Sequence, residues 1–250
     1  MRLIIDYGNT RIKTALFDSD KMVDYRVSSN LSIKGLLDFL GEGENSKSVT
    51  RPVRHVIVSS VVNYPTEIRE FLESRDSFVE FNSNTKLPFT NKYKTPETLG
   101  NDRISAVAGA LHVFPGNDLL VIDAGTCITY DFVNAKREYF GGGISPGIDV
   151  RFKALNTFTG KLPLITRTNN PPLIGRSTKE SIWSGVLNGV ISEVDGIIDR
   201  YIEKYPNIKI IFTGGDAIYF DKKLKNNIFA NSNLVMIGLN DILNINGGIN

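Results

Sequence analysis

Residues 119–132 read LLVIDAGTCITYDF, and they repeat the pattern of residues 3–17, LIIDYGNTRIKTALF. In each copy an apolar run, typical of a buried strand, leads into Asp, then Gly and Thr, and then a second strand-like run. The matched pairs are Asp6 with Asp123, Gly8 with Gly125, and Thr10 with Thr126. The repeat indicates a chain built from two similar halves.

Each copy carries residues suited to binding a polyphosphate. A glycine two residues after the aspartate lets the chain turn sharply and leaves its amides open. Successive free amides form a concavity that binds anions, and the carboxylate can hold a cation directly or through water. Two such turns facing one another would hold a cation-bearing polyphosphate from both sides.

A single copy of the pattern is equally typical of an ordinary hairpin with Asp and Gly in its turn. Two copies make that interpretation weak, and a third motif weakens it further. Residues 208–215, IKIIFTGG, form another buried-strand pattern that ends in Thr-Gly-Gly, where missing side chains let a flat ligand approach the backbone.

This order of motifs resembles the actin, hexokinase and Hsp70-like ATPase superfamily. The resemblance implies an α/β fold of duplicated ribonuclease-H-like (actin-like ATPase) domains, each a mixed sheet flanked by helices, with a nucleotide cleft between them. We expect an N-terminal half over residues 1–115, with the first phosphate loop, and a C-terminal half over 116–250, with the second loop and the Thr-Gly-Gly motif.

The composition narrows the class of protein. The chain has 250 residues, 41% of them hydrophobic, which suffices for one large domain or two smaller ones. Its net charge of +2, without a block of basic residues, gives no reason to expect nucleic acid or an acidic membrane as a partner. The opening sequence does not resemble a signal peptide, because Asp6 interrupts the apolar run. We expect a soluble, cytoplasmic protein.

The cysteine and the two histidines predict neither a disulfide nor a metal site. Cys127 is the only cysteine, so it cannot form an internal disulfide, and we expect it to be a small buried strand residue. The two histidines, His55 and His112, fall on a strand-like and a helix-like pattern, where structural roles are expected. A histidine-based zinc site is therefore not expected.

The segment Gly100-Asn101-Asp102-Arg103 follows a polar, proline-containing loop and precedes a helical pattern. Asp102 near a helix N-terminus is favoured as an ionised carboxylate, and by itself it would be interpreted as a helix cap. Arg103 opposes the helix dipole, so an anionic substrate group is one reason for its position. Lys13 is either a cation for a phosphate or a solvated strand lysine.

The second half contains two further signals. Residues 141–147, GGGISPG, are expected to form a tight turn before a helix. Ser177 and Glu180 have the spacing of a capping box, and they open a long helix that continues to about Lys204. This helix has a bulky side and a stripe of small residues, and we expect the stripe to admit another helix from the other half or from a second subunit; the stripe comprises Ser181, Gly185, Gly189, Ser192 and Gly196.

The ordered set DYGNTRIK, GNDR, DAGT, GGGISPG and GRST resembles type III pantothenate kinase, the bacterial enzyme of the first step of coenzyme A synthesis. The resemblance implies ATP-dependent phosphorylation of pantothenate to 4'-phosphopantothenate by a cytoplasmic homodimer, with both subunits completing the substrate site. It also implies ATP as donor, Mg²⁺, and a monovalent cation, K⁺ or NH₄⁺. Cys127-Ile128 departs from the family's common alanine and threonine there, but removes no ligand.

The resemblance also implies residue roles, and these are carried only onto matching positions. Asp102 is expected to be the catalytic base, Asp123 the ligand of the monovalent cation, and Asp6 a ligand of Mg²⁺, directly or through water. The expected ATP-binding residues are Asp6, Tyr7, Gly8, Asn9, Thr10, Arg11, Ile12, Lys13 and Thr126. The expected pantothenate-binding residues are Tyr93, Gly100, Asn101, Asp102, Arg103 and Thr178.

Physical chemistry supports these roles. Three carboxylates around a triphosphate would repel it in a low-dielectric cleft, so cations must belong to the site. An aspartate of ordinary pKa suffices as base, because proton removal is late in a loose phosphoryl-transfer transition state. The alternatives are another small-molecule kinase of the superfamily, a non-catalytic accessory regulator of the same fold, and a filament-forming ATPase.

Overall fold

The computed structural model describes residues 1–8, 11–42, 52–60 and 62–248. The chain separates into two compact units. Unit 1 comprises Met1–Thr90, Lys94–His112 and Leu234–Asn250, and unit 2 comprises Asn91–Tyr93 and Val113–Asn233.

Unit 1 is built on a five-stranded mixed sheet in the order β3-β2-β1-β4-β5. β1 pairs antiparallel with β2 and parallel with β4, and β4 pairs parallel with β5. The strands are β1 (Arg2–Tyr7), β2 (Ile12–Asp18), β3 (Lys21–Ser28), β4 (His55–Ser60) and β5 (Ser77–Glu80).

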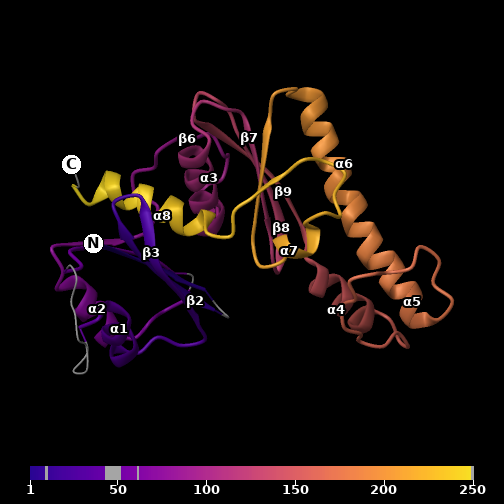
Figure 1. The fold of residues 1–250 in the computed structure, drawn as a ribbon, viewed down its shortest axis with the longest axis horizontal. Helices are drawn as coiled ribbons and strands as arrows, with labels where there is room; N and C mark the ends of the chain where they lie inside the picture. Colours follow the sequence, from indigo (N-terminus) through magenta and orange to yellow (C-terminus); the bar gives the residue numbers. More distant parts are fainter. Residues whose placement is uncertain (9–10, 43–51, 61, 249–250) are drawn as a thin grey trace. The chain divides into compact units, whose positions relative to one another are not determined.

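The central strands of this sheet carry apolar residues on both faces, so helices pack against both faces. Leu3 and Ile5 of β1 pack in one core with apolar residues of α1 (Ile33–Leu40) and α2 (Thr66–Glu73). The C-terminal helix α8 (Leu234–Asn246) contacts β1 and β4. Figure 1 shows α8 in yellow beside the indigo strands of the N-terminus.

The C-terminal helix also packs closely on α3 (Asn101–Val113). A Cβ atom added at Gly109 would collide with the backbone of Leu234, and one at Gly238 would collide with the backbone of Ser105. These glycines therefore permit the two helices to touch. As a result the compact units divide differently from the expected halves of 1–115 and 116–250, since residues 234–250 belong to unit 1.

Unit 2 contains a six-stranded mixed sheet in the order β11-β10-β7-β8-β9-β6. β7 pairs antiparallel with β8 and parallel with β10, as β1 does with β2 and β4. The strands are β6 (Thr90–Asn91), β7 (Leu119–Ala124), β8 (Cys127–Val133), β9 (Glu138–Pro146), β10 (Lys209–Thr213) and β11 (Phe229–Ala230). Apart from β6, the strand order matches that of unit 1, so the sequence repeat corresponds to a structural repeat.

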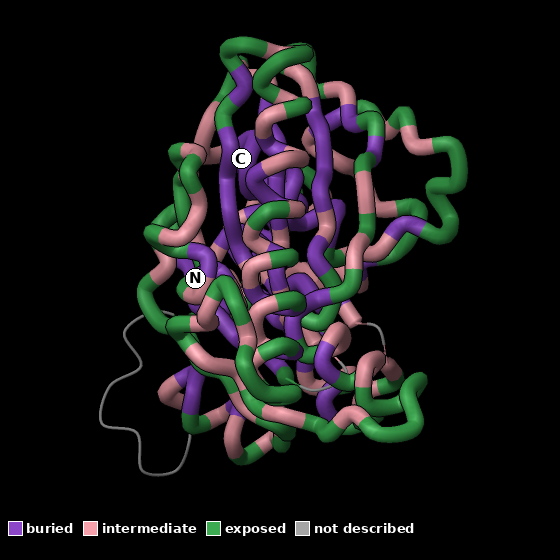
Figure 2. Tube along the Cα trace, turned by 90° about the vertical axis from the view of Figure 1, so that its right-hand side faces the viewer, coloured by how far each residue is buried: buried purple, intermediate pink, exposed green. Residues whose placement is uncertain are grey.

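One face of this second sheet packs against helices. Among the described residues, the remaining helical segments are η1 (Pro96–Thr98), α4 (Ile148–Phe158), α5 (Thr178–Trp183), η2 (Ser184–Asn188), α6 (Gly189–Lys204) and α7 (Ala217–Phe220). The bulky side of the long helix, including Ile182, Val190 and Val194, packs with strand residues such as Ile122 and Phe212. Figure 2 shows buried residues along the strands and inner helix faces, with exposed residues in the connecting loops.

The long helix predicted from Ser177 onward is present, but it is not uniform. α5 and α6 are joined through η2, a π-helical segment, and together they run as one rod (Figure 1). Two polar side chains of this segment hold a neighbouring loop: Ser184 Oγ donates to the Leu173 carbonyl at 2.6 Å, and Asn188 Nδ2 donates to the Pro172 carbonyl at 3.1 Å.

Three expectations need correction. Gly141, Gly142 and Gly143 belong to β9 rather than to a turn, and a Cβ at Gly142 would collide with the Tyr130 carbonyl of β8. Only Gly147 of this motif precedes a helix directly, as the N-cap of α4. Cys127 is exposed at the start of β8, not buried. Within unit 2, no described helix covers the small-residue stripe: four of its five residues are exposed, and a Cβ at Gly185, Gly189 or Gly196 would meet no atom. Contact of the stripe with a second subunit stays a prediction. Residues 41–48, GEGENSKS, are polar and predict a turn, but most of them lie outside the described residues.

Candidate active site

The first phosphate turn follows β1. Asp6 and Lys13 face one another across the β1–β2 pair, and Lys13 Nζ lies 3.3 Å from Asp6 Oδ2. The Gly8 amide donates to the Arg11 carbonyl at 3.1 Å, which closes the turn. Two of the expected ATP-binding residues, Asn9 and Thr10, lie outside the described residues. Lys13 is therefore paired with the carboxylate of the motif rather than only solvated.

The electrostatics of Asp6 involve two other expected site residues. Burial raises the pKa of the Asp6 carboxyl, Lys13 opposes this shift, and the charge of Asp102 adds to it. Burial is the largest effect because it disfavours the charged form. Asp6 and Asp102 are thus close enough within unit 1 to influence one another.

The segment Gly100–Arg103 forms the start of α3, as the sequence predicts. The exposed Asp102 carboxylate accepts a hydrogen bond from the Arg103 amide at 2.8 Å, and a Cβ at Gly100 would collide with that carboxylate. Asn101 accepts a hydrogen bond from Ser105 Oγ at 2.7 Å through its carbonyl. Arg103 is only 6% exposed, which is unusual for a cation in the first turn of a helix.

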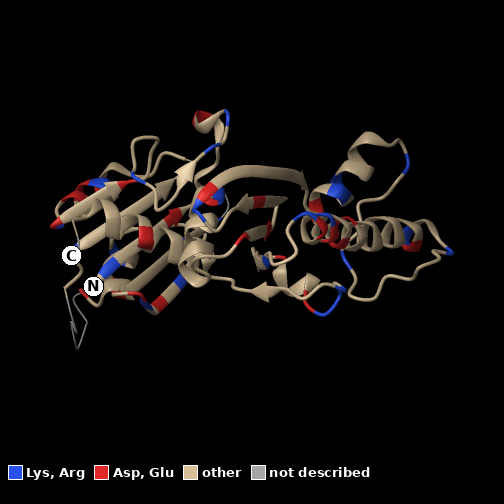
Figure 3. Ribbon diagram, turned by 90° about the horizontal axis from the view of Figure 1, so that it is seen from above, with Lys and Arg blue, Asp and Glu red and all other residues tan. Residues whose placement is uncertain are grey.

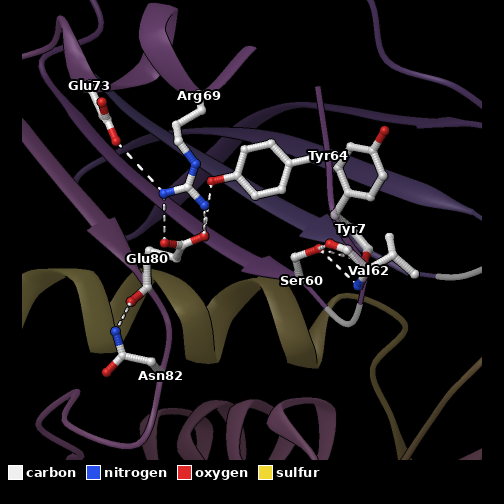
Figure 4. Close-up of polar contacts among 8 residues, drawn as sticks. All are labelled: Tyr7, Ser60, Val62, Tyr64, Arg69, Glu73, Glu80 and Asn82. Carbon is white, nitrogen blue, oxygen red and sulfur yellow. Dashed lines mark hydrogen bonds and ion pairs between the residues drawn. The ribbon is translucent and has the colours of Figure 1, made fainter. Parts of the chain in front are cut away.

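Figure 4 shows the side chains around Tyr7, the last residue of β1, which come from β4, from α2 and the segment before it, and from β5. Ser60, at the end of β4, has its hydroxyl 3.4 Å from the Tyr7 carbonyl and accepts from the Val62 amide at 3.2 Å. The Tyr7 ring lies 5.7 Å from the Tyr64 ring. The Tyr64 hydroxyl donates to Glu80 at 3.2 Å.

Glu80 in turn receives a two-pronged bond from Arg69, with distances of 2.9 and 2.5 Å. This fork holds Tyr64 beside Tyr7, as Figure 4 shows. Burial and the Glu80 charge raise the pKa of Tyr64 to about 12, so its hydroxyl remains a donor at neutral pH. No sequence motif predicted this support, because its members come from three separate segments.

The second phosphate turn follows β7 in unit 2. The Gly125 amide donates to the Cys127 carbonyl at 2.8 Å, and the Thr126 carbonyl accepts from the Gly147 amide at 2.9 Å. Gly147 has no room for a side chain, since a Cβ there would collide with the carbonyls of Gly125 and Thr126. The Ser145-Pro146-Gly147 segment thus lies directly against this turn.

The Thr-Gly-Gly motif lies on the other side of the same strand. Thr213 pairs with Asp123 in the parallel register of β10 and β7. Gly214 has φ of 96°, and a Cβ there would collide with the Ala124 carbonyl and the Asp123 carboxylate. The Asp216 amide donates to the Ala124 carbonyl at 2.9 Å. The predicted second phosphate turn and the predicted Thr-Gly-Gly motif are therefore adjacent within unit 2.

Arg167 connects the elements around this pair of motifs. Its Nε donates to Asp149 of α4 at 2.7 Å, and its Nη1 donates to Asp216 at 2.6 Å. The hydrogen bond from Arg167 lowers the pKa of Asp149, and the two carboxylates raise the pKa of Arg167. No local sequence pattern predicts this bridge, because Arg167 lies 18 positions from Asp149 and 49 positions from Asp216.

The two remaining predicted substrate residues lie elsewhere in unit 2. Tyr93 packs on Tyr139, with ring centres 6.2 Å apart, and against Gly141, whose φ is 93° and whose Cβ would overlap the Tyr93 ring. Thr178 begins α5, where Ser177 accepts from the Glu180 amide and Glu180 accepts from the Arg176 amide. The Ser177 half of the predicted capping box is therefore confirmed, whereas Glu180 accepts from Arg176 rather than from the Ser177 amide.

Thr178 lines a cavity of about 1160 Å³. Its apolar lining comes mainly from α4 and the long helix, with Leu155, Phe158 and Ile182 among the residues. Arg151, Arg176 and Ser177 supply polar groups. The helical pattern of α4 was visible in the sequence, but nothing in it indicated that α4 lines a cavity with Thr178.

The described residues contain no group of three or more His, Cys, Asp and Glu side chains that could hold a metal ion. Over the same part of the chain, no helix is long and apolar enough to span a membrane. Lysine and arginine are interspersed with aspartate and glutamate along both units, as Figure 3 shows.

The repeated sheets and their Asp-Gly-Thr turns define a protein of the actin-like ATPase fold. Solved structures share it: one titled a putative Baf family transcriptional activator, from Campylobacter jejuni, has a TM-score of 0.57 at 20% identity, covering 99% of this chain and 100% of that chain. An activator of 2-hydroxyisocaproyl-CoA dehydratase from Clostridium difficile has a TM-score of 0.51 at 10% identity, covering 99% and 94%.

Sequence comparison identifies the family. Residues 2–200 match the family model described as type III pantothenate kinase. Proteins of that name from Bacteroides fragilis and Christiangramia forsetii are 45% and 44% identical to this chain, covering 99% and 98% of it and 99% of each relative. The chain belongs to the type III pantothenate kinase family.

Proposed function

We propose that this chain transfers the γ-phosphoryl group of ATP to the primary hydroxyl of pantothenate, giving 4'-phosphopantothenate and ADP, the first step of coenzyme A synthesis. The observation that carries the proposal is the family match over residues 2–200, together with relatives of that name that align over nearly the whole chain. The two phosphate turns and the Gly100–Arg103 segment supply the chemistry such a reaction needs.

Asp102 is the proposed base. Its exposed carboxylate accepts the hydroxyl proton as the substrate oxygen forms a bond to the γ-phosphorus and the bond to the bridging oxygen of ADP breaks. The Arg103 amide and the crowded Gly100 position hold that carboxylate at the start of α3. Arg103 is proposed to bind the substrate carboxylate, because a guanidinium suits that group.

The two turns are proposed to bind the phosphates of ATP, with Lys13 as a nearby cation. Amides other than those of Gly8 and Gly125 would donate to the phosphates, because these two already donate to the carbonyls of Arg11 and Cys127. Asp6 is a carboxylate that fits Mg²⁺, whose role when bound is to neutralise charge on the transferred group. The Lys13 ammonium does not fully offset the burial of Asp6, so its ionised form is costly without a further cation, which supports Mg²⁺ beside it.

Asp123 is the proposed ligand of the monovalent cation. Thr129 lies opposite Asp123 in the β7–β8 register, and its Oγ1 is buried without a hydrogen-bond partner among the described residues. An oxygen left in this state fits a cation that takes oxygen ligands. K⁺ or NH₄⁺ at this position would offset the charge of Asp123 beside the phosphates.

The enzyme is proposed to act as a cytoplasmic homodimer whose subunits together complete the pantothenate site. Three large apolar side chains near the Thr178 cavity support this: Phe158, Leu173 and Ile174 are 85%, 83% and 76% exposed. The open small-residue stripe of the long helix is suited to close contact with a second copy. Large apolar side chains this exposed are typical of interaction sites when they gather in one region of the surface.

The test is ADP release by the purified protein with ATP and Mg²⁺, with and without pantothenate, in sodium and in potassium buffer. The proposal predicts release that needs both pantothenate and potassium. Release independent of pantothenate, or none from a folded protein that binds ATP, would point to another acceptor or to a non-catalytic regulator.

A further inference from the structure

Four polar side chains meet at the side of the second sheet. Glu193 of α6 accepts hydrogen bonds from Arg151 Nη2 at 2.6 Å and from the Tyr130 hydroxyl at 3.2 Å. Arg151 also donates to Ser145 Oγ at 2.7 Å through Nη2 and to the Pro146 carbonyl at 2.8 Å through Nε. One glutamate thus joins α6, α4, β8 and β9.

This cluster leads directly to the second phosphate turn. Arg151 binds the Ser145-Pro146 segment, and the next residue, Gly147, donates its amide to the Thr126 carbonyl at 2.9 Å. The Arg151 amide also donates to the Gly147 carbonyl at 3.1 Å. Because Gly147 is packed against Gly125 and Thr126 without room for a Cβ, a shift of this segment must move the turn.

The charges in the cluster are matched. Burial by itself would raise the pKa of Glu193, but hydrogen bonds from Ser145, Arg151 and Tyr130 outweigh it and lower that pKa. Burial and the Glu193 charge raise the pKa of Tyr130, so its hydroxyl remains a donor. Glu193 and Arg151 are only 29% and 21% exposed, so removing one charge leaves the other poorly solvated.

We propose that Glu193 is a positioning residue for phosphoryl transfer, acting through Arg151 and the Ser145–Gly147 segment to hold the second phosphate turn at Thr126. The expected change in kinetics rests on the proposed function. The expected change in nucleotide affinity does not depend on which acceptor the enzyme uses. Glu193 itself contacts neither the turn nor its amides through any hydrogen bond among the described residues, so its effect is indirect.

The test compares Glu193→Gln with Glu203→Gln. Glu203 lies on the same helix, is exposed, and makes no hydrogen bond or ion pair with a described residue, so it is a matched control. We expect Glu193→Gln to weaken ADP binding, measured by calorimetric titration with Mg²⁺, by about tenfold, because small displacements of a positioning group cost this much or more. The control should bind ADP as the unchanged protein does.

Kinetics separate positioning from general destabilisation. Loss of folded enzyme lowers kcat and leaves both KM values unchanged, whereas a displaced phosphate turn raises the KM for ATP and lowers kcat. We expect the KM for ATP to rise about tenfold in Glu193→Gln, with the KM for pantothenate changing less than about twofold. Unchanged ADP affinity with a lower kcat alone would overturn the proposal.

A double-mutant cycle tests the route through Arg151. If Glu193 acts through that side chain, Glu193→Gln should weaken ADP binding little further in an Arg151→Met background, whereas independent effects would multiply. Multiplying effects would contradict the proposed route. If Glu193→Gln does not fold, Tyr130→Phe supplies the same comparison, because it removes one hydroxyl from the cluster. A loss of ADP affinity smaller than tenfold in Tyr130→Phe would support the positioning role of Glu193. Unchanged ADP affinity in both Tyr130→Phe and Ser145→Ala would oppose that role.

These experiments distinguish failure of the positioning role of Glu193 from failure of the proposed function. If the unchanged protein binds ADP but does not phosphorylate pantothenate, the acceptor is wrong, and the titrations of the Glu193 and Glu203 variants still decide the positioning role. If it phosphorylates pantothenate and Glu193→Gln binds ADP normally, only the positioning role is wrong.

Discussion

The Lys13 ammonium lies 3.3 Å from a carboxylate oxygen of Asp6, across the first pair of strands. The ion pair does not fully offset burial, because the pKa of Asp6 is raised, with burial the largest cause and Asp102 adding to it. The charge of Asp6 therefore lowers the stability of the fold. Under the proposed function, the same charge is required for cation binding.

Replacing Asp6 with Asn should separate these two effects. A native pKa above the unfolded value of 3.8 means that the native state binds the proton more readily, so stability falls as pH rises from about 3.8 through the raised native pKa. Asp6→Asn should therefore raise the thermal midpoint at pH 7.5 and lose this advantage near pH 3, while activity falls at least about a hundredfold. Asp38→Asn, at an exposed site on α1, is the control.

Asp102→Asn should abolish turnover and leave ATP binding intact, since the amide cannot accept the hydroxyl proton. Gly100→Ala should act more mildly, because the new methyl group must push the Asp102 carboxylate aside. We expect kcat to fall about tenfold with little change in the KM for ATP. Near-normal turnover by Asp102→Asn would exclude Asp102 as the base.

Arg167→Ala should destabilise unit 2 by about 1 kcal/mol, a value kept low because Arg167 and Asp149 are partly exposed. The native pKa of Asp149 is lowered by Arg167, so this stabilisation is present above pH 3.8 and is lost as pH falls through the lowered native pKa. Unfolding followed at pH 7 and pH 2.5 should give a difference at the higher pH only. An equal difference at both values would assign the effect to packing instead.

Ile174→Asp should disrupt the proposed homodimer, because it places a charge on a side chain that is 76% exposed beside the Thr178 cavity. Light scattering after size exclusion should report a monomer of about half the mass, with pantothenate-dependent activity lost. Val23→Asp, at a 48% exposed apolar site on β3 of unit 1, should leave the oligomeric state unchanged. A monomeric unchanged protein with full activity would contradict a shared site.

The repeat of Asp, Gly and Thr predicted both sheets, because a buried strand that ends in a tight turn is encoded locally. The sequence also predicted α3 from the helical pattern after Arg103, and the start of α5 from Ser177 and Glu180. These signals depend on residues a few positions apart, so a single sequence displays them.

The missed features depend on contacts between distant residues. The glycines at 141–143 suggested a turn, but Gly141 and Gly142 are needed where β9 approaches Tyr93 and Tyr130 too closely for a side chain. The Glu193 to Arg151 bond joins residues 42 positions apart. Neither follows from local pattern. The role assignments, including Asp102, Asp123 and Thr178, stay predictions.

The most direct test of the central claim is mass spectrometry of the small-molecule product after incubation with ATP, Mg²⁺, K⁺ and pantothenate. The account predicts a pantothenate-derived species heavier by one phosphoryl group, formed by the unchanged protein and absent with Asp102→Asn. Unmodified pantothenate after incubation with a folded, ATP-binding protein would contradict it.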